Sequence, residues 1–295
     1  MKKFVILIPV YNDWESLFKL LNKIDSQIID WDASASILII NDASTAKKPE
    51  TEIAFKNIKL VRIINMKKNK GHARCNAAGL KFLSEKEDFD YIILMDGDGE
   101  DRPEELNLLF NKSKENPLKA VIAERISRSE GFFFKALYEC HKILTYAFTG
   151  KLIKFGNYSC LPKKDVMRLV KEASIWSSFS GSVTKTILER VSVPSIKGQR
   201  YFGSSQMNLF NLFIHSFSII AVFKKVVIAR SFLFLIIYLF FVSNNLTAIT
   251  IFPALIVIIF LFLILKTSSR ENIQELNSSL ENISSIDALS NFNDR

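Results

Sequence analysis

The chain has 295 residues and a formal net charge of +9, from 39 Lys and Arg against 30 Asp and Glu. This length holds one large domain, or one domain with an appendage. The basic charge suits an anionic membrane or a phosphorylated ligand. A nucleic-acid partner is not expected, because no zinc-like Cys/His cluster or nucleic-acid-binding module accompanies the charge. The three cysteines are odd in number and widely spaced, which predicts reduced thiols in a cytoplasmic setting.

The first 205 residues mix charged and apolar residues as a soluble domain does. Short apolar runs typical of buried parallel strands alternate there with segments of helical spacing. This pattern predicts an α/β sheet with helices on both faces, so that ligands bind beyond the carboxyl ends of the strands. The expected strands span 4–10, 37–40, 60–64, 91–95 and 120–123, and the expected helices 14–25, 72–86 and 103–114.

An aromatic-rich stretch with lysines follows at 131–150, and its spacing predicts a helix. Such a helix suits a membrane interface, although a core-facing helix of a soluble domain has the same pattern. Residues 206–225 are apolar with interspersed Asn, His and Lys, which predicts an amphipathic segment beside a membrane.

Two long apolar segments come next, at 226–242 and 246–265. The second carries no charge and is long enough to cross a hydrocarbon core of about 30 Å, and the first can span if Arg230 reaches the headgroups. Basic residues flank the pair on one side only, which places both ends in the cytoplasm. We therefore expect a cytoplasmic domain (1–205), a juxtamembrane segment (206–225), a membrane hairpin (226–265) and a polar cytoplasmic tail (266–295) that is a frayed amphipathic helix or disordered.

Four carboxylates follow the predicted strand 91–95 directly: Asp96, Asp98, Glu100 and Asp101. A hard divalent cation such as Mg²⁺ or Mn²⁺ prefers oxygen ligands and keeps open positions for substrate phosphates. Asp96 and Asp98 can both reach one such ion. The alternative is an acidic turn before the helix near Pro103, and we expect Asp101 to cap that helix.

Two other predicted strand ends carry polar residues suited to a nucleotide. Lys70 and Gly71 precede a helix, and a helix N-terminus with glycine and basic residues favours phosphate, although the same residues describe an ordinary loop. His72, at the start of that helix, is assigned no catalytic role. Asn12 and Asp42 follow the first and second strands and can bind a base and ribose, or simply form turns.

Taken in order, these motifs resemble those of the family-two inverting glycosyltransferases of the GT-A fold. The motifs are Pro-Val-Tyr-Asn at 9–12, Asn-Asp-Ala-Ser at 41–44, Asn-Lys-Gly-x-x-x-x-Asn-x-x-Gly at 69–79 and Asp-x-Asp at 96–98. More narrowly, the chain is similar to dolichyl-phosphate mannose synthase and the bacterial polyprenyl-phosphate glycosyltransferases. Residues 200–205, Ser-Phe-Ser at 216–218 and the two apolar segments match that subfamily, and the resemblance covers roughly 4–265.

The resemblance implies transfer of a sugar from a nucleotide-diphosphate sugar to a polyprenyl phosphate, with undecaprenyl phosphate as the expected lipid. It places a multi-pass protein in the cell inner membrane, with its catalytic domain cytoplasmic and a Mg²⁺ or Mn²⁺ ion bound. A homo-oligomer is compatible with it. The implied catalytic residues are Asp98, Arg200 and Arg125, the metal ligands Asp96, Asp98 and Glu100, and the donor-binding residues Pro9, Tyr11, Asn12, Asp42, Lys70, Gly71, Asp96, Arg128 and Ser205.

Three positions depart from the family pattern. Asn41 replaces the first Asp of an Asp-Asp pair, Gln206 replaces a Lys, and Tyr158-Ser159-Cys160 stands where Phe-Arg-Leu is expected. The lost Arg and Lys would remove two phosphate contacts. A divergent or inactive GT-A membrane protein that binds a partner, or a transferase with another membrane-associated acceptor, therefore stays open as an alternative.

Overall fold

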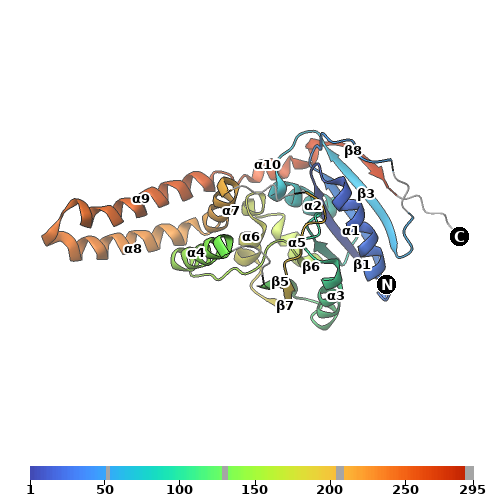
Figure 1. The fold of residues 1–295 in the computed structure, drawn as a ribbon, viewed down its shortest axis with the longest axis horizontal. Coiled ribbons are helices and arrows are strands. Elements are labelled where there is room, and N and C mark those ends of the chain that lie inside the picture. The colour runs from blue at the N-terminus through green and yellow to red at the C-terminus, as the bar shows by residue number, and fades with distance from the viewer. Residues whose placement is uncertain (51–53, 128–131, 204–208, 290–295) are drawn as a thin grey trace.

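A mixed eight-stranded sheet forms the centre of the computed structural model, which describes residues 1–50, 54–127, 132–203 and 209–289 (Figure 1). The strand order is β7-β5-β6-β4-β1-β2-β3-β8. The strands are β1 (Lys2–Val10), β2 (Ala33–Asn41), β3 (Ile58–Met66), β4 (Tyr91–Leu94), β5 (Ala120–Ser127), β6 (Ser159–Pro162), β7 (Arg190–Ile196) and β8 (Ile283–Ala288).

Both faces of the sheet are covered, as the apolar runs predict. In the central strand β1, Phe4, Ile6 and Ile8 belong to one hydrophobic core, whereas Val5 and Leu7 belong to the other. This alternation follows from the two-residue period of a strand. It explains why nearly every residue of β1 is apolar, because β1 pairs in parallel with β2 and β4 and has no solvent-facing side.

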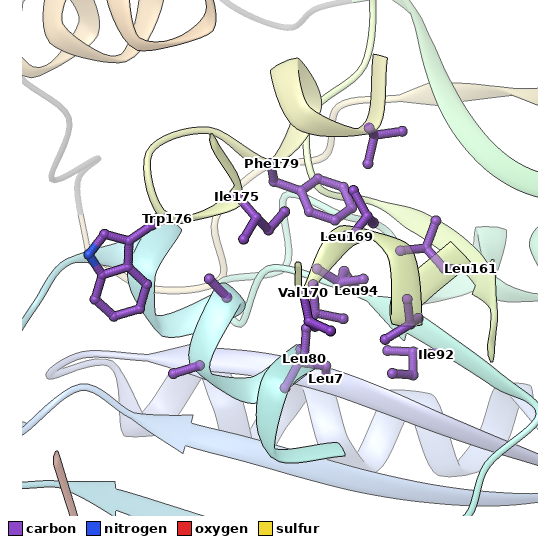
Figure 2. Packing of buried hydrophobic residues seen from close by; sticks show 14 of the residues in the cluster. Leu7, Leu80, Ile92, Leu94, Leu161, Leu169, Val170, Ile175, Trp176 and Phe179 are labelled. Atoms are coloured by element: carbon purple, nitrogen blue, oxygen red, sulfur yellow. The ribbon is translucent and has the colours of Figure 1, made fainter. Parts of the chain in front are cut away.

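The helices divide between these two cores. Residues of α1 (Trp14–Gln27) and α3 (Leu106–Glu115) pack in the core of Phe4, and η1 (Pro103–Glu105) leads into α3. Residues of α2, α5, α6 and η2 pack in the core of Leu7, and Figure 2 shows Leu7 and Leu80 close to Val170 in this second core. These elements span His72–Lys86 (α2), Lys163–Leu169 (α5), Phe179–Thr186 (α6) and Ala173–Trp176 (η2).

The structure predicted for the tail, residues 266–295, is wrong over residues 266–289. Instead of a frayed helix or a disordered segment, it forms α10 (Ile273–Asn277), η4 (Ser279–Asn282) and β8, which pairs antiparallel with β3. One apolar residue of the tail, Leu276, is fully buried in the core that also contains residues of α2. Asn272 starts α10 by accepting the backbone N–H groups of Gln274 and Glu275.

Two further strands have no counterpart among the predicted ones. β6 runs antiparallel to β4 and β5, and β7 pairs in parallel with β5. β6 has only four residues and contains Pro162, and β7 contains Pro194, so neither shows the apolar run that marks β1.

Helices α8 (Lys224–Val242) and α9 (Ala248–Ser268) project from the sheet as an antiparallel pair joined by η3 (Ser243–Asn245) (Figure 1). The most apolar 18-residue stretches within 224–245 and 248–277 have mean hydropathies of 2.4 and 3.1, and only 11% of each stretch is buried. Both are long and apolar enough to cross a membrane, and their low burial distinguishes them from core helices of a soluble protein.

The predicted interfacial helices α4 (Phe132–Thr149) and α7 (Leu209–Ala221) lie at the base of this pair (Figure 1). Arg230 of α8 does not point freely toward headgroups. Its guanidinium donates to the carbonyl oxygens of Tyr146 (3.2 Å) and Ala147 (2.9 Å), so it satisfies the last turn of α4. This contact ties α4 to the apolar pair.

Candidate active site

The acidic loop after β4 is folded tightly by two glycines. A Cβ at Gly97 would lie 3.0 Å from the carbonyl oxygen of Pro9, and one at Gly99, where φ is +88°, would lie 2.6 Å from the Tyr201 ring. Only glycine accommodates both approaches. Within the loop, Asp98 accepts the backbone N–H of Glu100 at 3.0 Å. The alternate residues Asp96 and Asp98 thus lie at the carboxyl end of β4, as the sequence predicts.

A second loop, which follows β7, closes over the first. The backbone N–H groups of Gly198 and Tyr201 donate to the carbonyl oxygens of Glu100 (2.8 Å) and Asp98 (3.0 Å). These bonds bring Arg200 to the acidic loop, where one guanidinium nitrogen lies 2.8 Å from Asp98 Oδ2 and another pairs with Asp13. The structure therefore brings the predicted residues Asp98 and Arg200 together and adds Asp13 to them.

His72 also belongs to this cluster, although no role was predicted for it. Its Nε2 atom lies 3.2 Å from Asp96 Oδ1 and 2.7 Å from the side-chain nitrogen of Asn157, which donates to the same carboxylate at 3.1 Å. The placement of His72 at the start of α2, next to Gly71, is the signal that could have found it. Asn157 precedes β6, a strand that the sequence does not reveal.

Asp101 does not cap the helix near Pro103, so this prediction is wrong. The segment starts at Arg102 without a side-chain cap, and the buried Asp101 carboxylate instead accepts the backbone N–H of Asp96 at 3.0 Å. Arg125 approaches Asp101 to 3.8 Å. Because Asp96 lies just beyond the end of β4, its backbone N–H has no partner in the sheet. The Asp101 carboxylate supplies the acceptor, and an unpaired backbone N–H away from water would be unfavourable.

Residues 5–176 match the sequence profile described as glycosyl transferase family 2. The chain belongs to this family. It is similar to the undecaprenyl-phosphate 4-deoxy-4-formamido-L-arabinose transferases of Klebsiella pneumoniae (strain 342), at 28% identity over 221 residues, and of Salmonella choleraesuis (strain SC-B67), at 27% over 223. Each match covers 72% of this chain and 65% of the relative, so the chain matches slightly less than two thirds of the length of these relatives.

The fold of this family 2 glycosyltransferase is shared with glucosyl-3-phosphoglycerate synthase from Mycobacterium tuberculosis, solved with Mn²⁺, uridine diphosphate and glucosyl-3-phosphoglycerate. The TM-score is 0.53 at 12% identity, covering 76% of this chain and 80% of that one. At this identity the likeness concerns the fold alone. The predicted family and GT-A fold are both confirmed.

The acidic loop of the transferase is electrostatically crowded. Burial and the charge of Asp96 raise the pKa of Asp98 to about 6, and the same two causes raise the pKa of Asp101 to about 8. Burial opposes ionisation of Asp96 as well, but the charge and hydrogen bond of His72, with the Asn157 amide, hold its pKa below the ordinary value. A divalent cation between Asp96 and Asp98 would relieve this repulsion, so the donor set fits one.

The predicted third ligand, Glu100, is directed elsewhere. Its carboxylate pairs with Lys197 at 2.9 Å. Across residues 1–50, 54–127, 132–203 and 209–289, no three Asp, Glu, His or Cys side chains converge in an arrangement that could hold a metal. Asp96 and Asp98 remain as a pair, and two carboxylates with substrate phosphates are a usual ligand set for Mg²⁺.

The predicted donor-binding residues at β1 and β2 serve partly to position loops. Asn12, at φ +53°, accepts the backbone N–H groups of Thr45 (2.8 Å) and Ala46 (2.9 Å), so it joins the loops after β1 and β2. Asp42 is buried and accepts the N–H groups of Lys70 (2.9 Å) and Gly71 (2.8 Å). Both side chains thus position the loops at the carboxyl ends of β1 and β2.

The remaining predicted residues lie near the ends of β1 and β2 or outside the residues that the structure describes. Pro9 lies against Gly97, and Tyr11 is about half exposed beside it on the chain. Asn41, the departure from the family's first Asp, donates to Asn65 at 2.9 Å and accepts from the Ser44 amide, so an amide suits this position. Two predicted residues, Arg128 and Ser205, lie outside the described residues, as does the departure at Gln206.

Proposed function

We propose that this transferase moves a sugar from a nucleotide-diphosphate sugar to a polyprenyl phosphate, undecaprenyl phosphate, at the cytoplasmic face of the inner membrane. The single observation that carries this proposal is the contact of Arg200 with Asp98. It puts a guanidinium group, which suits phosphate oxygens, beside the carboxylates at the end of β4. The family match and the activity for which the two relatives are named support the choice of donor and acceptor.

The neighbourhood of α7 and α4 supports a lipid acceptor. Helix α7 packs against α4, α6 and α9 at the base of the apolar pair. The same helix exposes Phe210 and Phe213. Such an exposed apolar face suits a lipid whose tail stays in the bilayer while its phosphate reaches the active site.

The reaction requires no strong base. The second pKa of a phosphate monoester is about 6, so its oxygen is already ionised near neutral pH. This oxygen forms the new bond to the anomeric carbon as the bond to the diphosphate breaks, which inverts the configuration and releases the nucleoside diphosphate. A Mg²⁺ or Mn²⁺ ion held by Asp96 and Asp98 would supply neutralisation of charge on the diphosphate. Arg200 would hold and orient the phosphates, because its planar fork suits their oxygens.

The hairpin of α8 and α9 would anchor the enzyme with both ends cytoplasmic. Lys224 and Lys225 precede it, Lys266 and Arg270 follow it, and the turn Ser243–Asn245 has no basic residue. We expect a cysteine at position 244, in a Cys140→Ser background, to react with a membrane-impermeant maleimide from the periplasmic side of intact cells. Labelling only after lysis would contradict this orientation, and a cysteine at position 269 is the control that should react only after lysis.

Turnover tests the activity directly. Purified protein should be assayed with UDP-, GDP- and dTDP-sugars, with and without undecaprenyl phosphate, in the presence of Mn²⁺ or Mg²⁺. We expect one donor to yield a glycosylated lipid and free nucleoside diphosphate, dependent on the lipid. A folded protein that consumes none of these donors, or that transfers the sugar to water at the same rate without lipid, would contradict the proposal.

A further inference from the structure

The segment after the apolar pair returns to the sheet. Residues 271–288, here called the C-terminal strap, run from the end of α9 past α2 to β3, where β8 extends the sheet (Figure 1). Two contacts hold the beginning of the strap. Glu271 pairs with Lys224 of α8 at 2.9 Å, and Glu275 accepts the indole N–H of Trp176 at 3.0 Å. The strap thus connects the apolar pair with the far edge of the sheet.

The end of η4 then contacts the loop between β3 and α2, residues 67–71, here called the donor loop. The Lys67 backbone N–H donates to the Asn282 carbonyl oxygen at 2.7 Å, and its ammonium group donates to the Glu281 carbonyl oxygen at 2.8 Å. In return, the Asn282 side chain donates to the carbonyl oxygen of Lys68 at 2.9 Å. Three hydrogen bonds therefore fix the first half of the donor loop to the strap.

The second half of the donor loop is held by Asp42, through the amides of Lys70 and Gly71. Gly71 has φ +91° and nothing within 4 Å of its Cβ position, so local packing does not fix it. A cavity of about 280 Å³ lies next to these contacts, and Asp42 and Lys70 line it together with Ser279 and Asn282. The conformation of the loop thus depends on its two ends rather than on contacts beneath it.

We propose that Asn282 is a positioning residue for donor binding, which acts by fixing the donor loop so that Lys70 and Gly71 face the diphosphate of a nucleotide sugar. This inference rests on the proposed function, in which those two residues contact the donor. Because the strap begins at the apolar pair, it joins the membrane-facing part of the chain to the donor side of the cleft.

The matched pair of variants Asn282→Ala and Asn277→Ala separates this role from general support. Both remove an asparagine side chain from the strap, but Asn277 contacts Lys81 of α2 (3.5 Å) rather than the donor loop. One hydrogen bond of this kind changes an equilibrium by about two- to tenfold. In Asn282→Ala we expect the donor KM to rise by that factor with kcat within about twofold, whereas Asn277→Ala should match the wild type.

Hydrogen exchange gives a readout that does not need turnover. The amides of Lys70 and Gly71 should exchange about two- to tenfold faster in Asn282→Ala than in Asn277→Ala. Unchanged exchange, or equal acceleration in both variants, would overturn the inference. If the amides of β8 also lose protection, the strap has detached as a whole, and Lys67→Met, which removes only the bond to Glu281, then decides by the same two readouts.

The two proposals fail in different ways. If the wild-type protein turns over no nucleotide sugar, the proposed function fails, while exchange at Lys70 and Gly71 still tests whether Asn282 fixes the loop. If the wild-type protein is active and Asn282→Ala keeps the wild-type donor KM, the positioning role is refuted and the proposed function stands.

Discussion

The carboxylates at the ends of β2 and β4 lie at the same edge of one sheet but have different surroundings. Asp42, after β2, has both oxygens occupied by backbone N–H groups. Asp98 and Asp101, after β4, are crowded against Asp96, and the pKa of each is raised. The difference separates two uses of an acidic residue. One shapes a loop and needs no ligand, whereas the others repel one another, and a bound cation would relieve that repulsion.

The largest expected effect comes from neutralising the crowded cluster. Asp98→Asn should lower the rate of transfer by at least about 10³. The variant lacks a carboxylate that would hold the cation, and the negative charge on the leaving diphosphate is then not neutralised. Glu104→Gln is the control, since this nearby carboxylate is exposed and pairs with Lys23 and Arg102. Steady-state assays with saturating donor and lipid measure the effect. Full activity in Asp98→Asn would show that Asp98, like Asp42, is not needed to hold a cation.

The second effect concerns pH. Asp98 must be ionised to bind a cation, and its pKa is about 6. The apparent affinity for Mn²⁺ should therefore be constant above this value and fall by up to about tenfold for each pH unit below it. Titration of Mn²⁺ followed by electron paramagnetic resonance measures this. An affinity that does not change between pH 7 and pH 5 would show that Asp98 is not a ligand.

Asp42→Asn should have a smaller effect of a different kind. An amide can accept only one of the two N–H groups, so one charge-assisted hydrogen bond to residues 70–71 is lost, at a cost of about 1.5–3 kcal/mol. We expect the donor KM to rise about tenfold with little change in kcat. Asp25→Asn is a matched control, since Asp25 also accepts backbone N–H groups, those of Lys56, Asn57 and Ile58, before β3. Equal donor KM values in the two variants would contradict a role for Asp42 at the cleft.

The smallest effect is on stability. The pKa of Asp101 is about 8 in the folded protein, above the value of about 3.9 for an exposed Asp. Its contribution to stability is thus present at low pH and is lost as the pH rises toward 8. Without divalent cations, Asp101→Asn should therefore lose less stability than the wild type between pH 6 and pH 8, by on the order of 1 kcal/mol. Denaturant unfolding of both proteins tests this, and parallel pH profiles would contradict it.

The sequence predicts the parts of the fold that repeat a simple pattern. The buried apolar runs predict β1 to β5, and α2 spans 72–86 as expected, because periodicity alone determines such elements. The short or proline-containing strands β6 and β7 lack that signal. β8 is missed for another reason: a strand at 283–288 gains its stability from pairing with β3, a partner more than 200 residues away.

The candidate site shows the same limit. Asp96 and Asp98 can be predicted from residue types and order, because strand ends of an α/β sheet meet at one edge. Arg200 is implied only by the family resemblance. The positions of Asn157 and Asp13 depend on how loops fold over that edge, which local sequence does not specify. Asp101 was assigned to the helix start for its residue type, yet the unpaired amide of Asp96 determines its position.

The thermal stability of the protein with Mn²⁺ and a nucleoside diphosphate tests the central claim most directly. Because a ligand that binds only the folded state stabilises it, the wild-type melting temperature should rise when both are added and should not rise in Asp98→Asn. Glu104→Gln should respond as the wild type does. A wild-type protein that shows no rise with any of UDP, GDP or dTDP, or an Asp98→Asn variant that is stabilised equally, would contradict a cation site at the end of β4.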